Sequence, residues 1–155
     1  MTVEYISPIG KLYITSDGEC LTEIEFFSSA HEVSAFSDKV IEETFRWLDL
    51  YFSHIVPDFT PSLKLMGSDF SRAVLSECAN IGYGETNTYG DIAKKVAERL
   101  GKNPCARAVG GALNRNPIPI VIPCHRVIGK NNEMVGFAFG VDVKVKLLMH
   151  EKYKK

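Results

Sequence analysis

Apolar and polar side chains alternate along most of the first 26 residues of the chain. The alternating segments cover residues 3–6, 11–15 and 21–26, and short breaks rich in Ser, Pro, Asp and Gly separate them. Alternation with a period of two puts every second side chain on one face of a sheet. Tight turns between such segments favour antiparallel neighbours. The pattern therefore predicts a three-stranded antiparallel meander.

The apolar period changes between residues 37 and 52, where apolar side chains recur every three or four positions. The stripe consists of Val40, Ile41, Phe45, Leu48 and Phe52, with Trp47 and Tyr51 beside it. This is the period of one helical face, so we expect a helix that packs on the sheet. Residues 54–67 contain two prolines and a glycine, and they are typical of a linker.

The remainder of the chain has a helical pattern. Ser68 is expected to cap a helix over residues 69–79. Thr88 and Asp91 form a capping box for a helix over residues 89–100, which Gly101 ends. We therefore expect an α+β protein, with a small N-terminal antiparallel β-sheet plus helix in residues 1–61. A mostly helical C-terminal domain follows in residues 62–155.

Three further elements are expected in this second domain. Asn103 and Pro104 have the residue types that begin a helix, which makes a helix-turn-helix with the helix before it. Residues 127–137 are typical of a hairpin. Asp142 is expected to cap a last helix. The buried side of that helix is predicted to be Val145, Leu148 and Met149.

Charge divides the chain at the same place. The net charge of all 155 residues is −1. Residues 1–61 hold three basic and eleven acidic residues, and residues 62–155 hold fifteen basic and eight acidic ones. The C-terminal part alone is therefore suited to meet a phosphate backbone, although a solvated charged surface gives the same count.

Several classes of protein are not supported. No apolar run approaches the roughly 18 residues of a membrane span, and the N-terminus lacks the pattern of a signal peptide. The cysteines have no framework spacing and are expected to be reduced; they are Cys20, Cys78, Cys105 and Cys124. No spacing of Cys or His predicts zinc. We expect a cytoplasmic protein that needs no metal or other cofactor.

A thiol and an imidazole adjoin in an almost wholly apolar run. Cys124 and His125 follow residues 116–123, a segment that contains three prolines. Each proline fixes its own φ and favours extended backbone in the residue before it, so the segment should be stiff. A cysteine held rigidly beside a histidine is a candidate nucleophile. The alternative is a structural cysteine beside a hydrogen-bonded histidine.

The second helix of the predicted helix-turn-helix has an unusual composition. Among small side chains it offers Arg107, and Gly110 and Gly111 are adjacent. A helix that reads bases in the major groove needs several long polar side chains. Two glycines weaken a helix by about 1 kcal/mol each relative to alanine. Docking into the minor groove, with contacts to backbone and shape, explains this composition. Tight packing on another helix is the alternative.

These residues carry a resemblance to a known family. Residues 123–127, Pro-Cys-His-Arg-Val, resemble the active-site signature of the O6-alkylguanine-DNA alkyltransferases, or methylated-DNA–protein-cysteine methyltransferases. Residues 107–113 and Asn116 stand where that family has its DNA-binding helix and hinge asparagine, and Tyr89 and Glu151 fit in order and spacing. The resemblance is strong over residues 70–151 and faint in the N-terminal third. It implies a ribonuclease-H-like first domain and a winged-helix-like second domain.

The resemblance implies DNA repair by direct reversal. O6-alkylguanine is flipped from double-stranded DNA bound through the minor groove, and the alkyl group moves irreversibly and stoichiometrically to Cys124. Repair of O4-alkylthymine stays open, and we expect a monomer. The implied catalytic residues are Cys124, His125 as base, Glu151 as its orienting partner, Asn116, and Tyr89 as proton donor. By composition alone, Glu151 is a solvent-exposed charge.

The resemblance also implies residues that contact DNA and line the pocket. The DNA-contact residues are Tyr89, Arg107, Ala106, Ala108, Gly110, Gly111, Ser71 and Arg115. Arg107 is expected to take the place of the extruded nucleotide. The pocket residues are Leu113, Pro119, Phe137, Ala138 and Phe139. The chain departs from the family at Phe137, where tyrosine is usual, and at Phe139, where glycine is usual. The Phe139 ring is expected either to lean over the pocket mouth or to point to solvent, and we favour the pocket mouth.

Three other classes of function are weighed against this one. An alkyltransferase-like protein that binds damage without repair lacks the acceptor cysteine, which this chain has at Cys124. A helix-turn-helix regulator needs base-reading side chains and normally a dimer. A cysteine hydrolase needs an oxyanion hole, and no glycine pattern indicates one.

Overall fold

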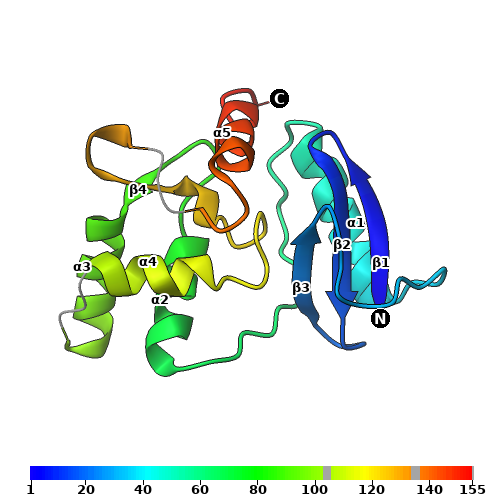
Figure 1. Cartoon of the computed structure of the whole chain (residues 1–155), viewed down its shortest axis with the longest axis horizontal. Coiled ribbons are helices and arrows are strands. Elements are labelled where there is room, and N and C mark those ends of the chain that lie inside the picture. The colour runs from blue at the N-terminus through cyan, green and yellow to red at the C-terminus, as the bar shows by residue number, and fades with distance from the viewer. Residues whose placement is uncertain (103–105, 134–136, 155) are drawn as a thin grey trace. The chain divides into compact units, whose positions relative to one another are not determined.

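The computed structural model describes residues 1–102, 106–133 and 137–154. It divides into two compact units, Met1–Leu65 with the last residues from Tyr153, and Met66–Lys152 (Figure 1). The expected α+β class is confirmed. The domain boundary expected after residue 61 stays a prediction. Among the described residues, no helix is long and apolar enough to cross a membrane.

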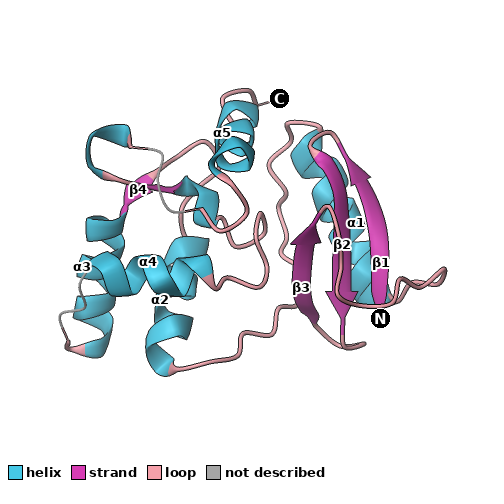
Figure 2. Ribbon diagram, viewed as in Figure 1, coloured by secondary structure: helices cyan, strands magenta, loops and turns pink. Residues whose placement is uncertain are grey.

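The first unit contains the predicted meander and helix. β1 (Thr2–Ser7), β2 (Gly10–Ser16) and β3 (Leu21–Phe26) form an antiparallel sheet in the order β1-β2-β3. α1 (Lys39–Phe52) covers one face of this sheet (Figure 2). Most side chains on that face are buried, and Leu12, Ile14 and Ile24 are almost inaccessible. The alternation in the sequence is therefore the alternation between the core and the outer face.

The buried stripe of α1 differs from the prediction in its aromatic residues. Trp47 and Tyr51, expected beside the stripe, are buried, whereas Phe45 and Phe52 are half-buried. The rings of Trp47 and Tyr51 lie one helical turn apart and stack with their centroids at 5.5 Å. Phe45 and Phe52 both meet the ring of Tyr5 on β1, with centroids at 4.9 and 6.4 Å, and this contact leaves each of them half-buried.

Three helices form the body of the second unit. α2 (Asp69–Ala79), α3 (Tyr89–Leu100) and α4 (Ala106–Asn114) all pack on one another. The predicted caps are present: the Ser68 side chain accepts from Ser71, and Thr88 and Asp91 form the capping box. α3 ends at Gly101 in a left-handed conformation with φ of 69°. The predicted start of α4 at residues 103–104 lies outside the described residues.

Short elements connect these helices to the last one. β4 (Asn87–Thr88) pairs in parallel with β5 (Val127–Ile128), a pairing that the sequence did not indicate. The 3-10 turns η1 (Cys124–Arg126) and η2 (Lys130–Asn132) flank β5. Residues 134–136 of the expected hairpin lie outside the described residues, so that hairpin stays a prediction.

The last helix, α5 (Val141–His150), differs from the prediction in its cap and its buried face. Gly140 is its N-cap, and Asp142 lies in the first turn. Val145 and Met149 are exposed, so the predicted face is wrong. The buried residues are Val143, Lys144 and Leu147. The reason is Lys144, whose ammonium donates to the carbonyl of Val127 inside the unit. The side of α5 that carries Lys144 therefore faces inward.

Candidate active site

A rigid loop precedes the thiol. The Asn116 side chain donates from Nδ2 to the carbonyl of Ile122 at 2.9 Å and accepts from the Ile118 N–H at 3.0 Å. The N–H of Ile122 donates to the carbonyl of Ile118 at 2.9 Å. Ile120 has a φ of 72°, a left-handed conformation that is rare for a β-branched residue and costs free energy. These bonds hold the loop in one shape.

Cys124 begins the 3-10 turn that follows this loop. Its side chain is buried, and the residue is only 5% exposed. Burial raises the pKa of the Cys124 thiol to about 11. A hydrogen bond from Asn116, the charge of Lys144 and the backbone N–H groups at Cys124 and His125 act in the opposite direction. The thiol therefore rests protonated, with groups in place that stabilise a thiolate once it forms.

His125 is fully buried and bound to a carboxylate. Its Nε2 lies 2.5 Å from Oε2 of Glu151, while its Nδ1 has no hydrogen-bond partner among the described residues. Burial lowers the pKa of His125, although Glu151 opposes this shift. A neutral imidazole that donates from Nε2 to a carboxylate has its lone pair on Nδ1. His125 therefore has the tautomer of a general base.

Glu151 lies at the C-terminus of α5, and three residues bind its carboxylate, His125, Arg126 and Gly84. Arg126 donates from Nε to Oε1 at 2.7 Å and from Nη2 to Oε2 at 3.1 Å, and the Gly84 N–H donates to Oε1. Burial acts to raise the pKa of the Glu151 carboxyl, but bonds and charge from His125 and Arg126 hold it well below its usual range. Because Arg126 stays charged, the carboxylate stays ionised beside a neutral His125.

Arg126 and Lys144 are two buried cations whose roles were not expected from the sequence. Arg126 also donates from Nη1 to the carbonyl of Ile81 at 2.7 Å, so its guanidinium is bound on both sides. An arginine inside an apolar run implies a buried acidic partner. This pattern in the sequence could have indicated the pair of Arg126 with an acidic residue such as Glu151.

Lys144 is a second cation beside the site. It is fully buried, and its Nζ donates to the carbonyl of Val127 at 2.6 Å and lies 5.7 Å from the centre of the Tyr89 ring. Burial lowers the pKa of Lys144, and Cys124 opposes this shift. Lys144 lies on the same side of α5 as the apolar residues Val143 and Leu147. A lysine in such a position could have indicated a buried cation. Its charge favours the thiolate of Cys124.

Tyr89 is the first residue of α3 and lies against α4. A Cβ atom added to Gly110 would meet the Tyr89 ring at 3.8 Å, an ordinary van der Waals contact, so the ring lies directly beside Gly110. Burial raises the pKa of the Tyr89 hydroxyl, and the charges of Cys124 and Cys78 add to this. Tyr89 therefore stays protonated, and the structure brings it together with the Cys124 site.

The other residues predicted to contact DNA lie on α2, on α4 or just after it. Ala106, Arg107 and Arg115 are exposed, and Ala108, Gly110, Gly111 and Ser71 are partly exposed. The guanidinium of Arg115 lies near Gly111, where an added Cβ would meet it at 3.4 Å. These residues are accessible, and their contacts with DNA stay a prediction.

The predicted pocket residues differ in their exposure. Leu113 and Pro119 are buried, Phe137 and Phe139 are partly exposed, and Ala138 is exposed. The rings of Phe137 and Phe139 meet edge to face with their centroids at 5.3 Å. Phe139 therefore packs on the ring of its neighbour, and its place at the pocket mouth stays a prediction.

Comparison with known proteins agrees with this geometry. Residues 69–153 match the family described as 6-O-methylguanine DNA methyltransferase, DNA binding domain, and residues 4–65 match its ribonuclease-like domain. The methylated-DNA–protein-cysteine methyltransferase of Methanosarcina acetivorans is 39% identical over 94% of both chains. The Mycobacterium leprae protein of the same name is 38% identical, over 96% of this chain and 90% of that one.

A solved structure supports the same relationship. Mycobacterium tuberculosis OGT, in complex with DNA, has a TM-score of 0.84 and 35% identity, over 97% of this chain and 92% of that one. The similarity covers both units and includes the half of the chain that holds Cys124, His125 and Glu151. The chain belongs to the 6-O-methylguanine DNA methyltransferase family.

Proposed function

We propose that this protein repairs duplex DNA by moving the alkyl group of O6-alkylguanine to Sγ of Cys124. The observation that carries this proposal is the buried pair of His125 and Glu151, with 2.5 Å between Nε2 and Oε2, directly after the buried thiol of Cys124 in the chain. The arrangement of nucleophile, base and orienting group is that of an activated thiol. The methyltransferase names of its relatives give the reaction class.

The first step removes the proton of the thiol. Nδ1 of His125 accepts it, directly or through a water molecule, and Nε2–H continues to donate to Glu151. The imidazolium that forms is stabilised by the ionised carboxylate, which Arg126 keeps charged. The thiolate that forms is favoured by Asn116 and Lys144. Because burial raises the pKa of the thiol, the free protein keeps it protonated. The proton is therefore removed only after the substrate has bound.

The second step is a displacement at carbon. The bond from Sγ to the alkyl carbon forms as the bond from that carbon to O6 breaks, and the purine leaves with the electron pair. Tyr89 is the proton donor to the leaving purine, because its hydroxyl stays protonated. The product is a thioether, a poor electrophile whose thiolate is a poor leaving group. Each protein molecule therefore acts once.

The DNA surface is formed by α3 and α4. Small side chains on α4 suit the narrow minor groove, and exposed Arg107 at its beginning takes the place of the flipped nucleotide. A damaged base pairs poorly and costs less to flip, which contributes selectivity. The net positive charge of residues 62–155 favours the phosphate backbone. The protein acts as a monomer. Transfer from O4-alkylthymine is to be compared with transfer from O6-alkylguanine.

Intact-protein mass spectrometry tests the proposal. The protein is mixed with duplex DNA that contains O6-methylguanine, and peptide mapping follows. We expect one methyl group per protein molecule, on Cys124. Binding to damaged DNA without a mass gain supports a damage binder, and a strong sequence preference in footprints supports a regulator. Either result contradicts the proposal.

Replacing Arg107 with alanine is expected to separate flipping from chemistry. Transfer from a duplex lesion should fall steeply, because the flipped base loses the side chain that replaces it. Reaction with the free alkylated base should change little, because Cys124 and its partners are untouched. Single-turnover rates on both substrates provide the measurement. Arg99→Ala is the matched control, because Arg99 is an exposed arginine of the same unit outside the predicted DNA contacts, and it should leave duplex transfer nearly unchanged. Equal losses on both substrates would rule out a role confined to DNA.

Replacing Phe139 with glycine is expected to widen the pocket. The Phe139 ring packs on Phe137, and its removal leaves room for a bulky adduct. The rate with O6-benzylguanine DNA should rise relative to the rate with O6-methylguanine DNA. Val141→Ala, which shortens an exposed side chain nearby, should leave the ratio of the two rates unchanged. An unchanged ratio in Phe139→Gly places Phe139 outside the pocket.

A further inference from the structure

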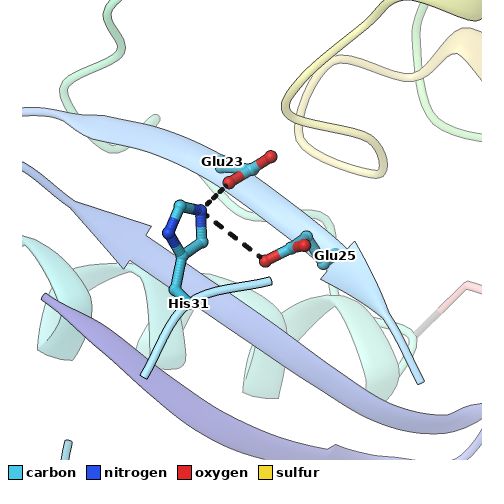
Figure 3. Close-up of side chains that lie close together, drawn as sticks. All are labelled: Glu23, Glu25 and His31. Atoms are coloured by element: carbon cyan, nitrogen blue, oxygen red, sulfur yellow. Dashed lines mark hydrogen bonds and ion pairs between the residues drawn. The ribbon is translucent and has the colours of Figure 1, made fainter. Parts of the chain in front are cut away.

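We propose that Glu23, Glu25 and His31 form a binding site for a first-row divalent cation on the outer face of the sheet. One ligand atom from each residue lies within 4.8 Å of the other two. The three side chains point toward one another on the side of the strands away from α1 (Figure 3). All three belong to the first unit, so the site is separate from Cys124 and independent of the function proposed above.

The sheet positions the two carboxylates. Glu23 and Glu25 lie two residues apart on β3, opposite Thr15 and Tyr13 of β2. Side chains at such positions point to the same face of a strand. The residues on either side of Glu25, Ile24 and Phe26, are buried in the core. The register of β3 therefore holds both carboxylates on the outer face.

The segment after β3 carries the histidine back over the strand. Phe27 has a φ of 68°, which turns the chain, and its N–H donates to the carbonyl of Lys11 at 2.8 Å. At the other end, the Ser34 N–H donates to the carbonyl of Thr2 at 2.7 Å. Residues 27–34 are thus tied to β2 at one end and to β1 at the other. His31 lies within this tied segment.

Hydrogen bonds inside the segment orient Glu25. The Ser29 hydroxyl donates to Oε1 of Glu25 at 2.5 Å, and the Ala30 N–H donates to Oε2 at 3.1 Å. The His31 N–H donates in turn to the Ser29 hydroxyl at 3.0 Å. Hydrogen bonds to a metal-binding side chain hold it in position before the ion binds, and they strengthen ion binding. They join Glu25 and His31 into one arrangement.

The separations suit a single small ion. Nε2 of His31 lies 2.5 Å from Oε1 of Glu23 and 3.9 Å from Oε1 of Glu25. Zinc binds nitrogen and oxygen ligands at about 2.0–2.2 Å, so two ligands of one ion lie roughly 3 Å apart. The two distances bracket that value. All three ligand atoms lie within 4.8 Å of one another, so rotations of the partly exposed carboxylates bring them to one ion.

The ligand set indicates the class of ion. Carboxylate oxygens alone suit magnesium and calcium, whereas an imidazole favours zinc, cobalt, nickel and similar ions. Binding requires the lone pair of His31 Nε2, so the proton of the neutral ring moves to Nδ1. The ion then replaces the proton between His31 and Glu23. Three protein ligands leave the remaining positions to water.

Local charge favours a cation at this place. Residues 1–61 hold three basic and eleven acidic residues. Lys11 lies on the same face of the sheet, but its Nζ pairs with Oε1 of Glu4 at 3.1 Å. A divalent ion therefore adds positive charge where Glu23 and Glu25 repel each other. It also ties residues 27–34 to β3, which stabilises the folded unit.

Cobalt titration of the full-length, chelator-treated protein tests the site. We expect one saturable equivalent with visible absorption typical of nitrogen and oxygen ligands. A thiolate-to-cobalt absorption band would indicate a cysteine site instead. His31→Gln and Glu25→Gln should each weaken binding by at least about tenfold. The matched controls, His54→Gln and Glu19→Gln in the same unit, should bind as the wild type does.

A measurement on the wild-type protein guards against variants that fold poorly. Nitrogen NMR of the imidazole rings is recorded while zinc is added. Nε2 of His31 should shift, and the rings of His54 and His150 should not. Unchanged His31 resonances, or cobalt binding that survives His31→Gln, would show that His31 and Glu23 form only a surface ion pair. Methyl transfer to Cys124 is measured separately, and its failure does not bear on this site.

Discussion

Replacing Cys124 with serine is expected to abolish alkyl transfer and to leave DNA binding intact. Burial already raises the pKa of the thiol to about 11, and Asn116 and Lys144 offset only part of this effect. A serine hydroxyl is a far weaker acid than a thiol, so the same groups cannot ionise it near neutral pH. Intact-protein mass after reaction with methylated DNA measures transfer, and fluorescence anisotropy measures binding.

The matched control for this variant is Cys105→Ser, which changes another thiol of the same domain. Cys105 lies outside the described residues; the sequence predicts it at a helix N-terminus, a place that stabilises a thiolate. The control should accept the methyl group at the wild-type rate. If Cys124→Ser still gains a methyl group, Cys124 is not the acceptor and Cys105 is the first candidate to replace it.

Replacing Arg126 with methionine is expected to cost about 3–5 kcal/mol of unfolding free energy. Methionine keeps most of the side-chain volume but removes the charge, and the Glu151 carboxylate is left buried with His125 and the Gly84 N–H. The lost bonds to Glu151 and to the Ile81 carbonyl add to this cost. Urea unfolding followed by far-UV circular dichroism gives the difference.

Arg99→Met is the matched control, because Arg99 pairs with Glu77 at 3.5 Å on the surface. Exposed pairs contribute about 0–1 kcal/mol, so this variant should stay close to the wild type. Equal losses in the two variants would contradict a special role for the buried pair.

The dependence of stability on pH provides a second readout for Arg126. The Glu151 carboxyl has a lowered pKa in the folded protein, so it binds a proton more readily when unfolded. Its contribution is present above the ordinary carboxyl pKa of about 4.3 and is lost as the pH falls below that value. Without Arg126 the folded pKa rises, so the variant should lose less stability than the wild type over this acidic range.

The site combines reactivity with protection through burial. A thiol at the surface would be ionised more readily, but it would also react with other electrophiles. Within the second unit, Cys124 is nearly inaccessible and protonated at rest. His125 Nδ1 is able to accept the proton, and Asn116 and Lys144 stabilise the thiolate that results. We infer that the substrate itself triggers activation, by excluding water and placing the alkyl carbon at Sγ.

Local patterns in the sequence determined much of the fold. The meander, α1, the Ser68 cap, the capping box of Thr88 and the left-handed Gly101 all followed from residues within a few positions of one another. Such features depend on backbone hydrogen bonds and periodic burial, which neighbouring residues control. The Cys-His pair in a proline-rich apolar run likewise identified the candidate nucleophile without any tertiary information.

The tertiary structure alone decided which charges are buried and with whom. His125 and Glu151 are 26 residues apart, and by composition Glu151 belongs on the surface. The burial of Lys144 reversed the predicted face of α5. His31 meets Glu23 and Glu25 only because the chain turns back at Phe27. A buried charge is tolerated where distant segments supply its partners, and no local pattern in the sequence records those partners.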